Sequence, residues 1–193
     1  MPRLFAGIEL PEAIRDLLSD LSKPLPGAKW VDDDDLHITL RFAGDIEGRV
    51  ARDFTDLLGE IETDAFELRL QDLGTFGGHD PRSIWAGIAP NPALDALARA
   101  CDRAARNAGL PPEPHPFKAH VTLARLRSAP PDVLATYLGG IGAFRSEPFA
   151  VGAFVLFSSR PKFGGGPYVV EATYPLRGAY DDMTDEADND KWS

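Results

Sequence analysis

A tripeptide pattern, His-x-Thr, occurs twice in this chain and limits what it can fold into. The two copies are residues 36–40 (LHITL) and residues 119–123 (AHVTL). Side chains on a β-strand alternate between two faces, so the His and the Thr of each copy share one face and their apolar neighbours share the other. Each copy therefore predicts a strand that packs on a core and presents an imidazole and a hydroxyl on its opposite side.

The rest of the chain alternates between strand and helix patterns. Helical spacing of apolar residues predicts helices at 11–21, 50–61 and 132–138, and a further helix that Asn91 caps and Gly109 ends. Strands are predicted at 3–10, 28–31, 36–43, 66–70, 83–89, 118–126, 149–158 and 168–176. Strands that alternate apolar and polar residues favour antiparallel sheets with one open face. The expected class is α+β: two pseudo-symmetric lobes of mainly antiparallel sheet, with outer helices, around a central cleft.

The charge distribution separates a body from a tail. We expect residues 1–180 to form a single bilobal domain, with the proline-rich residues 110–116 as the linker between lobes. Residues 181–193 contain six acids and one lysine, which predicts a disordered, solvated tail. The formal charge of −10 argues against extensive duplex binding through phosphate contacts. Recognition of one terminal phosphate needs only a few local donors and stays open.

Composition predicts a cytoplasmic protein without membrane contact. Apolar residues make up 44% of the chain and charged residues 26%, as in ordinary globular proteins. Cys101 is the only cysteine, so no disulfide framework is possible, and we expect it to be a small buried residue of its helix. The first apolar stretch is too short and too soon interrupted for a signal peptide. We expect a monomer, although the sequence does not determine the oligomeric state, since no heptad or exposed apolar stripe is evident.

Two imidazoles and two hydroxyls on facing strands would suit acid–base chemistry at phosphorus. A histidine near its ordinary pKa of ~6.5 can act as acid or base at neutral pH. One could take a proton from water while the other protonates a leaving oxygen, each transfer being worth ~10²–10⁴ in rate. Thr39 and Thr122 suit hydrogen bonds to non-bridging phosphoryl oxygens. Phosphoryl transfer also calls for a cation, and Arg41 and Arg125 are the candidates.

The side chains of Arg41 and Arg125 are expected to point to different faces of their strands. Strict period-two counting puts Arg41 on the face of His37 but puts Arg125 on the face opposite His120. A bulge or twist after Leu123 would be needed to turn Arg125 toward the cleft.

Other interpretations of these and neighbouring residues are weaker. Zinc binding by the two histidines is disfavoured, because no third ligand lies at a recognisable spacing. Residues 32–35 could hold magnesium, but a solvated turn with one aspartate capping the next element is favoured. The glycines at 164–166 are followed by no Gly-Lys-Ser/Thr, so they predict a flexible rim rather than a phosphate loop.

Some aromatic and histidine side chains have no assigned role. His79 and His115 lie in loop sequences and are expected to be solvated. Phe117 and Trp85 could stack a terminal base or could pack in the core, and the sequence does not separate these options.

The paired motifs and their flanking sequence resemble the two-histidine (2H) phosphoesterase superfamily. The similarity extends to its bacterial branch, the RNA 2′,3′-cyclic phosphodiesterases, also called 2′-5′ RNA ligases. The matching stretches are 3–11 (RLFAGIELP), 30–31 and 36–42 (WV, LHITLRF), 81–87 (PRSIWAG) and 116–125 (PFKAHVTLAR). The resemblance covers residues 2–176 and leaves out only the tail.

This resemblance implies roles for five residues. His37 would donate a proton to the leaving oxygen and His120 would accept one from water, while Thr39, Thr122 and Arg125 would bind the phosphate. The family opens a terminal 2′,3′-cyclic phosphate to a 2′-phosphomonoester without metal or other cofactor, and can join 2′,5′ linkages in reverse. The implied partner is an RNA or oligonucleotide end that carries the cyclic phosphate.

Two departures and two rivals accompany the resemblance. Ala119 stands where the family often has proline, and Arg41 where lysine is common. Neither changes a proton carrier. Ligation, or hydrolysis of another cyclic or 2′-5′-linked nucleotide, is the rival within the superfamily. The rival from another class is an RNA- or nucleotide-binding module without turnover, which the presence of both histidines disfavours.

Overall fold

Eight antiparallel strands form one sheet at the centre of the computed structural model, which describes residues 3–159 and 168–179. The strand order is β10-β9-β1-β3-β7-β6-β5, with β2 beside β7. The strands are β1 (Arg3–Glu9), β2 (Ala28–Trp30), β3 (His37–Asp45), β5 (Leu70–Phe76), β6 (Ser83–Ile88), β7 (His120–Leu126), β9 (Ala153–Ser159) and β10 (Tyr168–Pro175). A separate two-stranded sheet pairs β4 (Phe66–Leu68) with β8 (Phe149–Val151).

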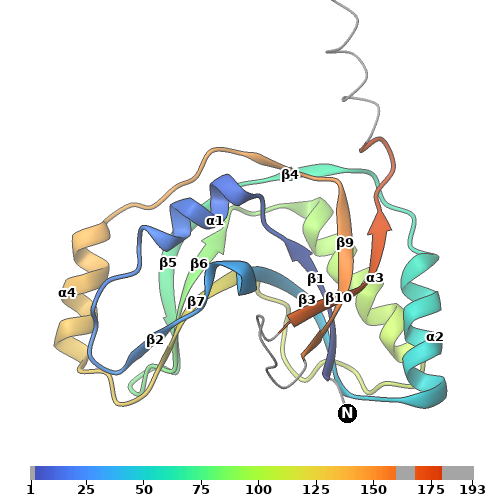
Figure 1. Ribbon diagram of the computed structural model, residues 1–193, viewed down its shortest axis with the longest axis horizontal. Coiled ribbons are helices and arrows are strands. Elements are labelled where there is room, and N and C mark those ends of the chain that lie inside the picture. Colours follow the sequence, from blue (N-terminus) through green and yellow to red (C-terminus); the bar gives the residue numbers. More distant parts are fainter. Residues whose placement is uncertain (1–2, 160–167, 180–193) are drawn as a thin grey trace, which may run out of the picture.

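Four α-helices surround the sheet in the described part of the chain. They are α1 (Glu12–Ser19), α2 (Gly48–Gly59), α3 (Pro92–Asn107) and α4 (Pro131–Ile141), with a 3₁₀ turn, η1 (Asp33–Asp35), before β3. Figure 1 shows α2 and α3 with the half of the sheet that contains β1, β3, β9 and β10, and α1 and α4 with the other half. The expected α+β class with mainly antiparallel sheet is confirmed. The expected lobes are the two halves of one continuous sheet.

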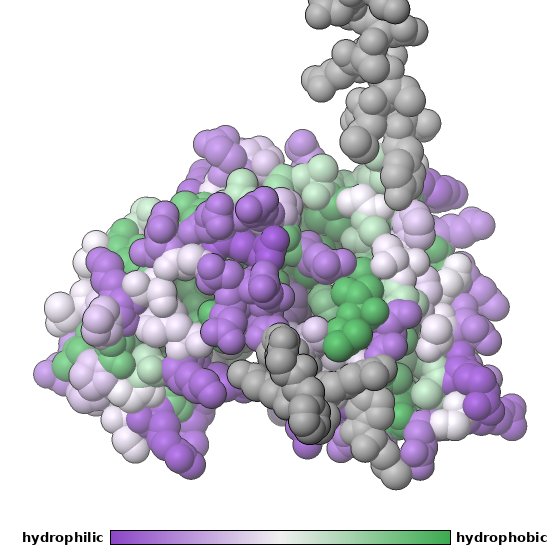
Figure 2. Space-filling model, viewed as in Figure 1, coloured by the Kyte–Doolittle hydropathy of each residue, from purple (hydrophilic) through white to green (hydrophobic). Residues whose placement is uncertain are grey.

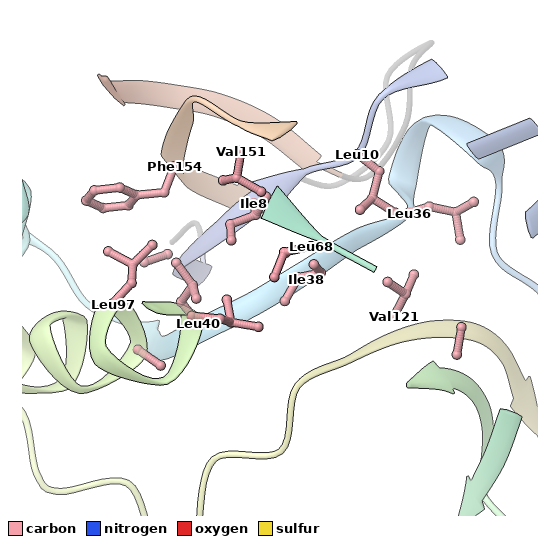
Figure 3. Close-up of a cluster of buried hydrophobic side chains, with 14 of the residues drawn as sticks. Ile8, Leu10, Leu36, Ile38, Leu40, Leu68, Leu97, Val121, Val151 and Phe154 are labelled. Carbon is pink, nitrogen blue, oxygen red and sulfur yellow. The ribbon is translucent and has the colours of Figure 1, made fainter. Parts of the chain in front are cut away.

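The two halves of the sheet meet where the motif strands β3 and β7 lie side by side. Along their shared edge β3 and β7 pair at one position, Ile38 opposite Val121. Both side chains are completely buried. Figure 3 shows Ile38 with Ile8 of β1, Leu68 and other apolar side chains in one core cluster. The apolar residues of the motifs therefore anchor both strands, as their alternation predicts.

The helix predicted between Asn91 and Gly109 follows its sequence signals closely. The Asn91 side chain accepts a hydrogen bond from the Leu94 amide (3.0 Å), and proline occupies the first helical position. Cys101 is fully buried, as expected, and burial raises the pKa of its thiol to about 12.

Two predicted strands are each divided in the structure. The apolar run 149–158 breaks at Gly152 into β8 and β9, which belong to different sheets, and 66–70 is divided between β4 and β5. Strand β5 then continues to Phe76 through an irregular register and a positive φ (62°) at Asp72. Such irregularities disrupt period-two alternation, so the sequence pattern did not show this strand. The predicted glycine rim and acidic tail lie outside the described residues.

Hydrophilic and hydrophobic side chains occupy separate areas on one face of the molecule. Figure 2 shows hydrophilic side chains gathered over α1 and η1, and hydrophobic ones over β9 and β10. Val169 and Val170 of β10 are 40% and 41% exposed. Among the described residues, no helix has the length and apolar character that crossing a membrane requires.

A close approach of β1 to β3 generates a test of this packing. A β-carbon on Gly7 would lie 2.7 Å from the Ile38 carbonyl oxygen and 3.0 Å from the Phe157 ring. We expect Gly7→Ala to lower the free energy of unfolding by about 1–3 kcal/mol, measured by urea denaturation. In the control Gly139→Ala, on α4, the new methyl meets nothing within 4 Å, and stability should be equal or higher. A Gly7→Ala midpoint equal to that of wild type would contradict this packing.

Candidate active site

A β-bulge interrupts both motif strands at the same place. The pairing of β3 with β1 skips Leu40, and the pairing of β7 with β6 skips Leu123. An extra residue reverses the alternation of the residues that follow it. The residue five positions after each histidine therefore turns to the histidine's own face. That residue is Phe42 on β3 and Arg125 on β7.

The bulge on β7 is the irregularity that the sequence required after Leu123. Arg125 is exposed and lines the same cavity as Thr122. Arg125 pairs with Lys29 of β2 on one side of β7 and with Ser83 of β6 on the other side. Neighbouring strands therefore flank the Arg125 backbone on both sides.

The bulge on β3 has the opposite effect on Arg41, whose predicted place on the His37 face is wrong. Arg41 is only 6% exposed and forms ion pairs with Asp102 of α3 (Nε to Oδ1, 2.8 Å) and with Glu113 (Nη1 to Oε2, 3.0 Å). It also donates to the backbone carbonyls of Phe42 and Pro111. Arg41 thus ties β3 to α3 and to the segment that precedes β7, and it does not line the cavity of Thr122 and Arg125.

A cavity of about 330 Å³ brings together four of the five predicted site residues. They are His37, Thr39, Thr122 and Arg125. Its other lining residues are Arg3, Phe5, Val31, Asp35, Phe42, Ser159 and Tyr168. His120 lines an adjoining groove, which shares Thr39 and Phe42 with the cavity. All five residues therefore border one continuous region.

The register between β3 and β7 sets the order of the motif side chains. Because Ile38 pairs with Val121 in antiparallel sense, His37 lies opposite Thr122 and Thr39 lies opposite His120. The two histidines thus take diagonal corners of a four-residue arrangement, and the two threonines take the other corners.

Each imidazole is held by a backbone carbonyl two residues earlier. Nδ1 of His37 donates to the Asp35 carbonyl (2.7 Å), and Nδ1 of His120 donates to the Lys118 carbonyl (2.6 Å). A carbonyl only accepts, so the neutral form of each ring carries its proton on Nδ1. Nε2 is then the nitrogen offered to a ligand. In His37 it lies 3.1 Å from the Thr39 hydroxyl.

Three aromatic rings enclose His37. The ring centroids of Phe5, Phe157 and Tyr168 lie 5.0, 5.5 and 5.0 Å from its own. Burial lowers the pKa of His37 below 6.5, and the carbonyl of Asp35 opposes this. The positive charges of His120 and Arg125 lower this pKa further, so both groups lie within electrostatic reach of His37.

His120 lies in a second aromatic setting. Phe76 contacts it edge-on, at 4.9 Å between centroids, and Trp85 lies beyond at 6.5 Å. Burial lowers the pKa of His120, the Lys118 carbonyl raises it, and the Lys118 ammonium lowers it. That ammonium lies 4.5 Å from the Trp85 ring centroid, a cation–π contact. Both histidines are therefore biased toward their neutral forms at pH 7.

The structure separates the two aromatics whose roles the sequence left open. Trp85 packs against Gly74, where a β-carbon would lie 2.3 Å from the indole, and it lies under Lys118. Phe117 is 37% exposed and borders the groove. One face of Trp85 therefore packs against its neighbours, and Phe117 offers a ring face at the surface.

The acidic turn before β3 is solvated in part. Asp32, at the start of η1, is exposed and makes no side-chain cap hydrogen bond to that 3₁₀ turn. Asp34 is exposed and pairs with Arg15, whereas Asp35 is 6% exposed and supplies the carbonyl that holds His37. The turn is solvated at one end only, because its last residue packs beneath the site.

Several residues at the site were not predicted from the sequence. Phe5, Tyr168 and Lys118 join it through tertiary contacts without a local signal. Phe42 did carry one, because it stands as far from His37 as Arg125 does from His120. The histidines at 79 and 115 are exposed, as expected. Among the described residues, no three His, Cys, Asp or Glu side chains cluster as metal ligands would.

Comparisons with known proteins agree on one family. The family described as LigT like Phosphoesterase matches residues 8–85 and 87–168. A Geobacillus stearothermophilus protein named RNA 2′,3′-cyclic phosphodiesterase is 32% identical over 185 residues, which are 92% of this chain and 57% of that protein. A relative of the same name from Aeropyrum pernix is 34% identical over 118 residues, covering 60% of this chain and 65% of its own length. The chain thus spans 57–65% of these two relatives.

Other relatives match along nearly their whole length. A Thermus thermophilus protein, also named RNA 2′,3′-cyclic phosphodiesterase, is 30% identical, and the match covers 92% of both chains. A crystal structure of a Thermus thermophilus protein has a TM-score of 0.78 at 28% identity, covering 91% of this chain and 98% of that one. Escherichia coli LigT complexed with 3′-AMP has a TM-score of 0.74 at 28% identity, covering 92% and 99%.

The contrast between the two arginines can be measured. Arg41→Ala leaves two carboxylates without their buried partner, so we expect a loss of about 3 kcal/mol in the free energy of unfolding. Arg125→Ala removes an exposed side chain and should change stability by no more than about 0.5 kcal/mol. Phosphate affinity, measured by titration calorimetry with inorganic phosphate, should be affected in the reverse order: Arg125→Ala should reduce it roughly tenfold, and Arg41→Ala should reduce it less. Equal phosphate affinity of Arg125→Ala and wild type would remove Arg125 from the anion site.

Proposed function

This chain belongs to the LigT-like phosphoesterase family, and we propose that it hydrolyses 2′,3′-cyclic phosphate ends of RNA or oligonucleotides to 2′-phosphomonoesters. The observation that carries the proposal is the single pairing of Ile38 with Val121, which puts both His-x-Thr motifs on one face, where they line the cavity and the groove that adjoins it. The names of the relatives support the substrate class.

The reaction divides between the two imidazoles. Nε2 of His120 accepts a proton from water, whose oxygen forms the new bond to phosphorus. The bond from phosphorus to the 3′ oxygen breaks, and protonated His37 delivers its Nε2 proton to that oxygen. The products are a 2′-phosphomonoester and a 3′-hydroxyl. Histidines on diagonal corners suit this step, because attack and departure occur on opposite sides of phosphorus.

The remaining residues bind the phosphoryl group. The hydroxyls of Thr39 and Thr122 donate to its non-bridging oxygens, and the Arg125 guanidinium supplies positive charge. An anion in the cavity also raises the pKa of His37, so substrate binding favours the protonated acid that burial alone disfavours. No step needs a metal ion or a cofactor, and we propose that a cytoplasmic monomer performs the reaction.

Each histidine can be tested separately. We expect His37→Ala and His120→Ala to lower kcat by about 10²–10⁴ on a 2′,3′-cyclic mononucleotide while the urea midpoint still reports a folded protein. His79→Ala, in an exposed loop, is the matched control and should keep wild-type kcat. Undiminished turnover in either motif variant would exclude that histidine from proton transfer.

Product analysis distinguishes this function from its rivals. The protein is incubated with a 2′,3′-cyclic nucleotide in excess chelator, and the products are followed by phosphorus NMR. A 2′-monophosphate supports the proposal. A 3′-phosphate points to another branch of the superfamily, no reaction points to a binding module, and loss of activity in chelator points to a metal.

The pH dependence follows from the lowered pKa values of both histidines. Catalysis needs one protonated and one neutral imidazole, so kcat/KM should peak between two apparent pKa values that both lie below ~6.5 in the free enzyme. The profile of kcat should shift to higher pH, because bound phosphate raises both pKa values. A kcat/KM that still increases above about pH 7 would contradict this assignment.

A further inference from the structure

A groove of about 530 Å³ adjoins the cavity, and apart from His120 and Thr39 its lining residues have no part in the reaction described above. It lies between β3, α3 and the segment that leads into β7. Thr39 and Phe42 border both spaces, and His120 lines the groove. A molecule in the groove would therefore be continuous with a phosphate held in the cavity.

Two aromatic side chains are exposed at this groove. Phe42 is 46% exposed, because the β3 bulge turns it outward, and Phe117 is 37% exposed. Exposed apolar side chains in a groove with a polar rim are typical of ligand-binding surfaces. Planar rings beside a phosphate site are suitable stacking partners for nucleobases.

The charges of the groove complement a polyanion. Arg99 and Arg103 lie one turn apart on the exposed side of α3 and border the groove. Neither forms an ion pair with any residue in the described part of the chain. The two acids that line the groove are already occupied, because Asp102 binds Arg41 and Arg106, and Glu113 binds Arg41. A chain with a formal charge of −10 thus presents locally uncompensated arginines beside its candidate active site.

We propose that this groove binds the RNA strand on the 5′ side of the cyclic phosphate: the terminal ribose lies on the His37 side of phosphorus, and the strand reaches the groove past Thr39 and Phe42, which border both spaces. This inference rests on the proposed function and specifies its substrate as single-stranded RNA rather than a free cyclic mononucleotide. Bases stack on Phe42 and Phe117, and the upstream phosphates pair with Arg99 and Arg103. The buried Arg41 cluster holds the floor of the groove by joining β3 to α3.

The test compares two substrates, a 2′,3′-cyclic mononucleotide and a tetranucleotide that ends in a 2′,3′-cyclic phosphate. The double variant Arg99→Ala/Arg103→Ala should lower kcat/KM about tenfold on the tetranucleotide, through KM, and less than about twofold on the mononucleotide. The difference in kcat/KM between wild type and the double variant on the tetranucleotide should shrink in high salt, because this difference depends on phosphate contacts. Arg52→Ala, an exposed arginine on α2, is the matched control and should change neither substrate.

The stacking component has its own variants. Phe117→Ala should lower kcat/KM on the tetranucleotide about tenfold, and Phe117→Tyr should restore it, because stacking needs only the ring. A loss that is equal on both substrates, or no loss on either, would overturn the groove assignment.

Binding measurements keep the groove testable apart from turnover. Fluorescence anisotropy of a labelled tetranucleotide with a terminal 2′-phosphate should show weaker binding to Arg99→Ala/Arg103→Ala than to wild type. If wild type hydrolyses neither substrate, the proposed function fails, and anisotropy still decides the groove. Equal affinities of wild type and the double variant would overturn it.

Discussion

The whole arrangement depends on one short contact, the pairing of Ile38 with Val121 between the two halves of the sheet. Both side chains are fully buried, so the strands cannot slide without exposing them, and a slip of one residue would also turn the histidines to the wrong face. The same register sets each histidine opposite a threonine. Hydrophobic burial on one face of the sheet therefore determines the order of the chemical groups on the other.

The two motif strands are similar in backbone but not in what they present. Each bulges at the same position, so the fifth residue after the histidine faces the cleft in both. On β7 this residue is Arg125, and on β3 it is Phe42. A nearly symmetric pair of strands thus gives the site one cationic side and one aromatic side, which suits a ligand with a phosphate at one end and a base at the other.

Burial and pairing divide the arginines by role. Arg41 is enclosed and neutralised by Asp102 and Glu113, so its charge stabilises the join between β3 and α3. The arginines at 99, 103 and 125 are exposed and keep their charge available to an anion. Because these two acids pair with Arg41, they do not neutralise the exposed arginines of the groove. The packing of α3 is in this way linked to the proposed recognition of RNA.

The sequence by itself determined the local features: the motif strands, the capped α3 helix, the buried Cys101 and the face that His and Thr share in each motif, because each depends on alternation, capping or spacing within one segment. The tertiary structure decided which residues change face at the bulges. The bulge on β3 turns the Arg41 side chain to the buried face of the strand and turns the Phe42 side chain outward. The tertiary structure also decided the aromatic enclosure of His37, the buried Asp35 and the groove beside α3. These depend on contacts between segments distant in the chain, whose register no local pattern encodes.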